Sequence, residues 1–334
     1  MNLLQKAILS TIAYYDTLDY PLTSFEVFKY LVNPLHIAGE VDKFSKISLI
    51  NIRKALESRE LKKIVEEKNG FFFLKGRKKI IRTRINRQKI ADQKWKKAKK
   101  IIHLLQIIPY LRMAGVSGSL ALNNTRENSD FDLLIATKSK RIWLTRFFVT
   151  LFIQLIGKRR HKNFTKDRIC LNHYITDKSL EIKFRSLYNA QTYAHIIPTL
   201  EIEEIYKKFQ KTNEWVKNYL VFWPELKITC SSARQGNFKI LKRNLLLRTI
   251  AKIGEICLNN WFGNLLENLS KRIQKKMIEK GPLVHKKGGR VTADDTQLEF
   301  HPNSQEKRIL ENYNKTIKNL GFPELASEKD SGLL

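Results

Sequence analysis

The segment from Gly118 to Ile135 constrains the fold more than any other part of the chain. It begins with a Gly-Ser pair, continues through a short polar stretch, and reaches Asp130 and Asp132 at the start of an apolar run. Because side chains alternate between the two faces of a strand, both carboxylates point the same way. Two like charges so close repel each other unless a cation lies between them. The pattern therefore predicts a strand that holds a divalent metal ion.

This arrangement resembles the signature of the DNA polymerase β-like nucleotidyltransferase superfamily, in which a Gly-Ser pair ends one strand and begins a helix, and an Asp-x-Asp pair lies on the next strand. The likeness is strong over residues 112–136 and weaker over 107–190. It implies an α/β (α+β) core with a mixed sheet, a Mg²⁺ cofactor and an NTP substrate. Asp130 and Asp132 are then the catalytic metal ligands, and the implied activity moves NMP from the NTP to an acceptor.

The residues around the Gly-Ser pair suit such chemistry. Gly118 lets the backbone approach a phosphate closely. Ser119 adds a hydroxyl at the start of a helix, where unpaired N–H groups favour an anion. Asn123 stands where relatives often have glycine, and asparagine tolerates a left-handed backbone. Arg126, inside the polar loop, is the cation that we expect to contact the triphosphate.

A third carboxylate, which active relatives carry on a neighbouring strand, is missing from its expected place. The matching strand, residues 168–175, contains no acid, and Asn172 or His173 occupies that place. Asparagine offers a carbonyl oxygen as a ligand, but it cannot act as a base. Three alternatives stay open: Glu181 supplies the acid, Asn172 is a weaker ligand, or the site is inactive. We favour the first two, which makes Glu181 and Asn172 catalytic candidates.

The charge of the chain points to polyanionic partners. Its 334 residues include 62 basic and 32 acidic side chains, a formal net charge of +30. Such an excess favours contact with nucleic acid. AT-rich coding also produces lysine-rich chains, but here the charges recur in clusters at residues 77–79, 94–100 and 158–162. We expect a nucleotide triphosphate as a partner and nucleic acid as a further candidate, whereas the oligomeric state stays open.

Cysteine content and hydropathy favour a cytoplasmic protein with no membrane partner. The cysteines, Cys170, Cys230 and Cys257, lie far apart and lack Cys-x-x-Cys spacing, which is typical of a reducing compartment. The first residues contain too short an apolar run for a signal peptide. Residues 143–156 are strongly apolar but shorter than the roughly 20 residues of a membrane span. We predict a buried helix there, covering the sheet.

Residues 1–76 are predicted to form a winged-helix-like domain. The pattern indicates a helix over 4–15, two capped helices that begin after Thr23 and Ser48, and a hairpin over 61–74. In that fold the third helix commonly contacts DNA. Here this helix carries acidic as well as basic residues, so DNA binding and docking of a protein both stay open.

The rest of the chain divides into four predicted segments. These are a basic linker helix over 77–106, a nucleotidyltransferase core over 107–190, a mostly helical C-terminal region over 191–326, and a disordered tail over 327–334. In the superfamily a helical C-terminal part often closes the nucleotide pocket. His301 is predicted to be structural, because the sequence gives it no company of metal ligands.

Three functions remain for comparison. The first is a Mg²⁺-dependent nucleotidyltransferase whose acceptor is RNA, a protein side chain or a small hydroxylated molecule. The second is a nucleic-acid-binding regulator whose nucleotidyltransferase-like domain senses nucleotide without turnover, which the missing strand acid favours. The third, an antitoxin-like partner of a helical toxin, ranks last, because this chain is longer than such proteins and has its own helical region.

Overall fold

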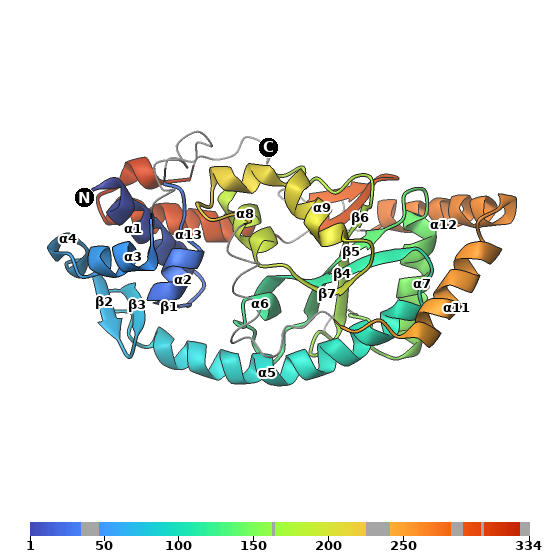
Figure 1. Ribbon diagram of the computed structural model, residues 1–334, viewed down its shortest axis with the longest axis horizontal. Helices are drawn as coiled ribbons and strands as arrows, with labels where there is room; N and C mark the ends of the chain where they lie inside the picture. Colours follow the sequence, from blue (N-terminus) through green and yellow to red (C-terminus); the bar gives the residue numbers. More distant parts are fainter. Residues whose placement is uncertain (35–46, 162–163, 225–240, 282–289, 302–303, 328–334) are drawn as a thin grey trace.

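The chain is an α/β protein with two sheets, joined by one long helix. The computed structural model describes all residues except 35–46, 162–163, 225–240, 282–289, 302–303 and 328–334. A small sheet with the first helices lies at one end of the molecule, and a six-stranded sheet lies toward the other (Figure 1). The predicted tail over 327–334 lies almost wholly outside the described residues.

The N-terminal elements follow the order that the sequence pattern predicts. Asn2, Thr23 and Ser48 each cap a helix through the backbone N–H three residues on, as capping boxes do. The three short strands form an antiparallel sheet in the order β1-β3-β2. The elements are α1 (Leu3–Asp16), β1 (Leu22–Thr23), α2 (Ser24–Lys29), α3 (Leu49–Leu56), α4 (Arg59–Lys62), β2 (Val65–Lys68) and β3 (Phe71–Leu74).

The predicted basic helix is α5 (Ile80–Leu104), which is 25 residues long and continues into η2 (Leu105–Ile107). It connects the small sheet to the large one along one side of the molecule (Figure 1). Its buried side includes Trp95, Ala98 and Ile102, whereas most of its lysines are exposed. Lys94 is an exception, because its ammonium group is buried and bonded to the core.

The large sheet is mixed, with strand order β7-β4-β5-β6-β9-β8. Only β5 and β6 run parallel among the described pairs, and the helix α7 crosses over between them, as parallel strands require. The elements are β4 (Leu111–Val116), α6 (Gly118–Ala121), β5 (Phe131–Thr137), α7 (Ile142–Leu155) and β6 (Ile169–Thr176). The helix predicted over 143–156 and the strand predicted over 168–175 agree with α7 and β6 to within one residue at each end.

The region over 191–326 is mostly helical, as predicted, but three of its segments are strands of the large sheet, which the sequence did not indicate. These are β7 (Ile197–Glu201), β8 (Arg290–Ala293) and β9 (Gln297–His301). Each is only four or five residues long, and such short runs show no clear alternation in a sequence. The remaining elements are α8 (Leu187–Ala194), α9 (Ile205–Thr212), η3 (Glu214–Asn218), α11 (Leu245–Cys257), α12 (Trp261–Glu279), α13 (Glu306–Asn319) and η4 (Pro323–Leu325).

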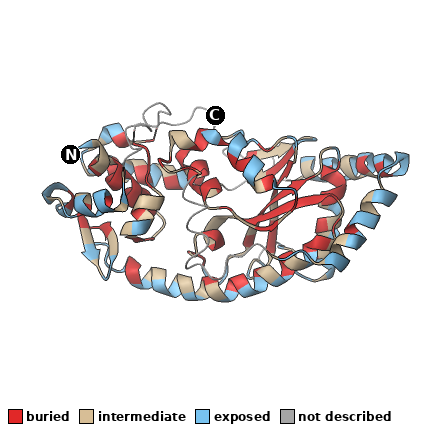
Figure 2. Ribbon diagram, in the orientation of Figure 1, coloured by how far each residue is buried: buried red, intermediate tan, exposed pale blue. Residues whose placement is uncertain are grey.

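The two ends of the chain share one hydrophobic core. Helix α13 packs against α1, and the rings of Tyr14 and Tyr313 meet edge to face with 6.2 Å between their centroids. Buried residues of α1, α8, α9 and α13 belong to one continuous cluster, and Figure 2 shows buried positions along all of these helices. The N-terminal elements therefore depend on the C-terminal helix for their packing.

Every helix within the described ranges is too short or too polar to cross a bilayer. The apolar helix predicted over residues 143–156 is α7, and it packs against β6 and α12.

Lys94 fixes α5 to the loops that flank β5 and β6. Its Nζ donates to Asp167 Oδ1 at 2.8 Å and to the carbonyl oxygen of Ser129 at 2.7 Å. We expect Lys94→Met to lower the free energy of unfolding by about 3 kcal/mol, because it removes two charge-assisted hydrogen bonds from a buried position. Asp167 keeps its ion pair with Lys97, and the Ser129 carbonyl oxygen keeps the bond from Asp167 N. Chemical denaturation measures this loss. The matched variant Lys96→Met, exposed on the same helix, should change stability by less than about 0.5 kcal/mol; equal effects of both variants would contradict the prediction.

Candidate functional site

A cavity of about 740 Å³ lies between α1 and the turn that follows it, α5, the large sheet, α8 and α13. Each of these parts supplies lining residues, so the cavity exists only when the two ends of the chain pack together. Polar and charged groups from the Gly-Ser turn and from β5 line it together with cations from α5 and α13. The residues used below are Tyr15, Arg87, Gly118, Ser119, Arg126, Asp130, Asp132, Tyr188, Gln191 and Arg308.

The Gly-Ser turn is built around a backbone conformation that favours glycine. Gly118 follows the end of β4 with φ of +64°, and a Cβ placed there would lie 2.5 Å from Asp132 Oδ2. Any larger residue would therefore strain the turn and displace the carboxylate. Asn123 adopts the left-handed conformation that the sequence analysis allowed for, with φ of +55°, and its Oδ1 accepts a hydrogen bond from Trp95 Nε1.

Asp130 and Asp132 lie together, and a nearby arginine offsets part of their charge. Their carboxylates and the thiol of Cys170 form a group whose ligand atoms all lie within 4.8 Å of one another. Arg160 Nη1 donates to Asp130 Oδ2 at 2.7 Å and to Cys170 Sγ at 3.3 Å. The two carboxylates are hard oxygen ligands of the kind that Mg²⁺ prefers, whereas the thiol is not. This donor set fits Mg²⁺, provided that Arg160 yields its place beside Asp130.

The protonation of Asp132 reflects this crowding. Burial, followed by the charge of Asp130, raises the pKa of Asp132 to about 7, although Arg160 and hydrogen bonds from Cys170 and Asn172 act in the opposite direction. Burial likewise raises the pKa of the Cys170 thiol, so the sulfur stays protonated at neutral pH. The group thus contains a half-buried carboxyl that is close to half protonated at neutral pH, and a divalent cation would favour its ionised form.

Of the two candidates for the position of the missing acid, Asn172 lies beside the aspartates and Glu181 does not. Asn172 Nδ2 donates to Asp132 Oδ1 at 3.4 Å, so its amide lies beside the pair. Glu181 lies beyond the far end of β6, is exposed, and forms an ion pair with Arg185 at 2.6 Å. Because β5 and β6 run parallel from Asp132 and Cys170 to Thr137 and Thr176, residues that follow β6 are carried to the opposite edge of the sheet. Glu181 is not among the residues that line the cavity.

Ser119 and Arg126, from which contacts to the triphosphate are expected, line the cavity, and further cations line it as well. Arg87 of α5 donates to the carbonyl oxygen of Leu18 at 3.0 Å and to Asn124 Oδ1 at 3.1 Å, so its position is fixed. Arg308 of α13 belongs to the same lining. Arginines suit phosphate oxygens, because their planar N–H groups match two of them at once.

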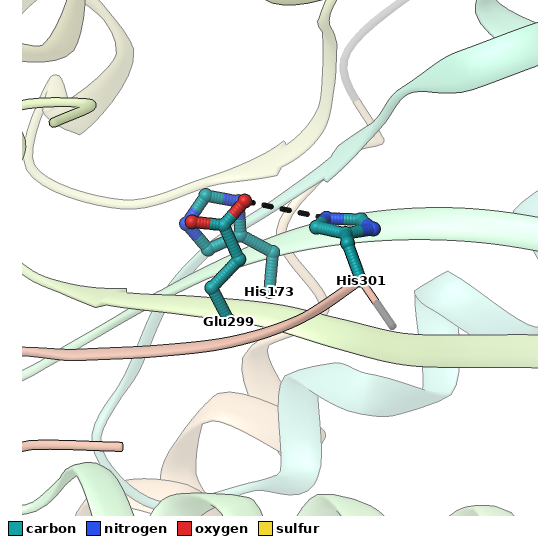
Figure 3. A group of neighbouring side chains, drawn as sticks. All are labelled: His173, Glu299 and His301. Atoms are coloured by element: carbon teal, nitrogen blue, oxygen red, sulfur yellow. Dashed lines mark ion pairs between the residues drawn. The ribbon is translucent and has the colours of Figure 1, made fainter. Parts of the chain in front are cut away.

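A second group of potential ligands lies next to the first, on β6 and β9. The side chains of His173, Glu299 and His301 approach one another (Figure 3), with ligand atoms within 4.8 Å. His173 already bonds Tyr193 and Gln297, at 2.9 and 3.1 Å. Glu299 forms an ion pair with the buried Arg290 at 3.3 Å. Burial lowers the pKa of His301 to about 4, so this imidazole is neutral at neutral pH.

The expectation that His301 has no potential metal ligands near it is wrong, because His173 and Glu299 lie beside it. The pairing of β6 with β9, which sets His173 opposite Glu299, brings the group together across more than a hundred residues of chain. His301 Nδ1 in turn accepts from Asn172 Nδ2 at 3.4 Å. Because Arg290 already balances the carboxylate, we interpret this group as a polar support for Asn172.

Sequence reasoning missed most of the cavity. Arg160 stands in the basic cluster over 158–162, but its pairing with Asp130 depends on how the segment before β6 folds back. Arg87, Arg308 and Tyr188 come from three different helices, and no spacing in the sequence relates them. The helical pattern of each segment was the one signal available for these residues. It predicts which side of a helix is buried, but not which element that side packs against.

Comparisons of this chain with protein-family models, with curated proteins and with solved structures found no match.

The raised pKa of Asp132 predicts that this carboxylate destabilises the metal-free fold at neutral and higher pH. Between about pH 4 and pH 7 the folded protein retains a proton that the unfolded chain has lost, so stability falls as pH rises through this range. Asp132→Asn stays neutral, and in the presence of a chelator we expect it to raise the free energy of unfolding at about pH 8 by about 2–4 kcal/mol. At about pH 4 wild type and variant should agree closely.

Urea denaturation at the two pH values measures this difference. Asp177→Asn is the matched control, because Asp177 follows the other end of β6 and accepts from Ser139 N. It should give no gain at high pH. A variant Asp132→Asn that is less stable than wild type at high pH would refute the interpretation.

Proposed function

We propose that this protein is a Mg²⁺-dependent nucleotidyltransferase of the DNA polymerase β-like kind, which transfers NMP from an NTP to an acceptor. The observation that carries the proposal is the close approach of the Gly118 turn to Asp132, with Asp130 beside it. A positive-φ glycine against a carboxylate pair, at the edge of a cavity lined with arginines, provides room and charge for a nucleotide triphosphate.

In the proposed reaction, different residues of the cavity would bind the metal ion and the phosphates. Asp130 and Asp132 are the residues that would hold Mg²⁺, and the bound ion supplies neutralisation of phosphate charge and activation of the attacking oxygen. Gly118 and Ser119 present backbone and hydroxyl groups to the phosphates. Arg126, which lines the cavity beside them, adds positive charge along the triphosphate.

The mixed sheet supports the family proposal. Strand β4 pairs antiparallel with β5, the Gly-Ser turn and α6 connect them, and β5 pairs parallel with β6. This is the arrangement that the resemblance implies for the Gly-Ser and Asp-x-Asp elements. The proposed setting is the cytoplasm, and nucleic acid remains the acceptor class that the charge of +30 favours.

The N-terminal part is proposed to be a winged-helix-like module. The helices α1, α2 and α3 and the one-turn helix α4 precede the hairpin, and β1 joins the hairpin in the order β1-β3-β2, which supports this proposal. The module contributes directly to the cavity, because Tyr15 lines it and the Tyr15 hydroxyl donates to Gln191 Oε1 at 2.7 Å. We propose that it positions the acceptor opposite the nucleotide.

A second candidate is a nucleotide-sensing regulator without turnover. It is favoured by the amide of Asn172, which stands beside Asp132 where active relatives have an acid. An amide cannot accept the proton of an acceptor hydroxyl. The two candidates share nucleotide binding and differ in turnover, so one experiment separates them.

We expect the full-length protein, incubated with Mg²⁺, labelled NTPs and cell extract, to label an acceptor. Asp130→Asn and Asp132→Asn should each reduce the labelling at least about 100-fold, because each removes several kcal/mol of charge stabilisation. Gel electrophoresis with nuclease or protease treatment identifies the class of acceptor.

Asp177→Asn is again the matched control and should label the acceptor as wild type does. Nucleotide binding without labelling, measured by titration calorimetry with each NTP, would favour the regulator. Labelling that persists in both aspartate variants would refute the assignment of the site.

A further inference from the structure

Helices α11 and α12 expose an unusual amount of apolar surface at the end of the molecule far from the N-terminal module (Figure 1). On α12 the exposed apolar residues recur every four positions, which places them on one ridge. Trp261 is 76% exposed, and four further residues of the ridge are 49–67% exposed. The residues of α12 are Trp261, Phe262, Leu265, Leu269, Ile273 and Met277; those of α11 are Leu245, Leu246, Ile250, Ile253 and Ile256. We call these residues the apolar face.

The apolar face points outward because polar residues hold the opposite side of each helix to the core. On α12, Glu267 accepts hydrogen bonds from the backbone N–H groups of Trp143 and Leu144, at 3.0 and 2.8 Å, at the start of α7. Gln274 donates to the carbonyl oxygen of Trp143 at 2.8 Å. A carboxylate at a helix N-terminus is well satisfied, so this side of α12 has a definite partner.

Helix α11 is held in the same way. Glu255 accepts from Tyr110 N at 2.8 Å and from both terminal nitrogens of Arg112, at 2.9 and 3.1 Å. Gly254 allows close approach, because a Cβ there would lie 2.8 Å from Pro109 Cγ. Neither helix can turn its apolar residues inward without breaking these contacts.

The charge around the apolar face is strongly positive. Lys252, Arg272, Lys275 and Lys276 are exposed on the same two helices. Over residues 245–280, all of which the structure describes, Glu255 and Glu267 are engaged with the core, and the one exposed acid is Glu279. The face therefore combines apolar and cationic groups with almost no negative charge.

We propose that the apolar face binds an anionic lipid bilayer at its surface. Amphipathic helices with aromatic and aliphatic residues on one side and Lys or Arg beside them lie in the interface of such membranes. So many exposed apolar residues on two consecutive helices are unusual on a monomeric protein without a partner. None of the described helices could span a bilayer, and binding at the membrane surface does not require a spanning helix. The expectation of no membrane partner agrees with the described helices in that none of them could span a bilayer, and the proposed surface binding departs from that expectation.

Charge complementarity selects the bilayer over a second copy of the chain. A symmetric dimer through this face would bring the same cations against each other in a molecule that already carries +30. Anionic headgroups instead attract each of these side chains by about 1 kcal/mol. Helix α7 packs on α12 and adds exposed Phe147, Leu151 and Leu155 at the same end.

The protein carries its own reporter for this interaction. Of its five tryptophans, Trp95, Trp143, Trp215 and Trp223 are buried, and Trp261 alone is exposed. Insertion of the apolar face into a bilayer should shift Trp261 emission to shorter wavelength and protect it from a soluble quencher.

The full chain is mixed with vesicles of phosphatidylcholine that contain phosphatidylglycerol, and separately with pure phosphatidylcholine. We expect co-flotation and the Trp261 shift with the anionic vesicles, and much weaker binding to the neutral ones. Leu265→Gln with Leu269→Gln should weaken binding about 100-fold, since each leucine contributes about 1.5 kcal/mol on burial. Arg272→Gln, Lys275→Gln and Lys276→Gln together should weaken it about 100-fold and reduce its dependence on salt.

The matched control is Ile50→Gln with Ile85→Gln, which changes exposed apolar residues on α3 and α5. It should bind vesicles as wild type does. Trp261→Phe should remove the emission shift and keep flotation. Unchanged flotation in the double leucine variant would overturn the proposal.

Two other results would also overturn it. One is that light scattering shows a dimer of the wild type and a monomer of the double leucine variant, since a second copy of the chain would then cover the apolar face. The other is protection of Trp261 by duplex DNA or RNA and not by vesicles. None of these measurements uses an NTP, so the proposal stands or fails separately from the proposed transferase activity.

Discussion

The parallel pairing of β5 with β6 is the constraint on which the candidate site depends. Strands that run in the same direction bring their beginnings to one edge of the sheet. Asp130 and Asp132 therefore meet Cys170 and Asn172 there, with Arg160 closing over them from the segment that precedes β6. The same pairing carries whatever follows β6 to the other edge, which is why Glu181 ends far along the sheet with Arg185 as its partner.

Sequence reasoning succeeded where the information is local. The caps at Thr23 and Ser48, the left-handed Asn123 and the strand of Asp132 follow from neighbouring residues, and the structure contains all of them. Asp130, which was expected on the same strand, lies one residue before it. It failed where short strands join a sheet from a distance. Nothing near β9 in the sequence indicates that Glu299 lies opposite His173, because that register is set by the whole sheet.

The net charge of +30 conceals several different roles for the basic residues. Lys94 is buried and structural, Arg160 balances an aspartate pair, and Arg87 is fixed by carbonyl oxygens in the wall of a cavity. The cluster over residues 94–100 was expected to favour contact with nucleic acid, whereas Lys94 binds groups within the fold. Charge counted along a chain predicts attraction to polyanions, but only the packing assigns each cation to its partner.

In the C-terminal helices, a few polar contacts to the core determine which side of each helix faces outward, against the usual burial of the apolar side. An amphipathic helix normally turns its apolar side to the core. In α12 the apolar side faces outward, because Glu267 and Gln274 bind the exposed backbone groups at the start of α7. Burying an acid without such partners would cost several kcal/mol, so the acid determines the rotation of the helix. Once that rotation is fixed, the apolar residues of α12 have no protein surface to cover within the described chain, and their exposure follows from the polar contacts beneath them.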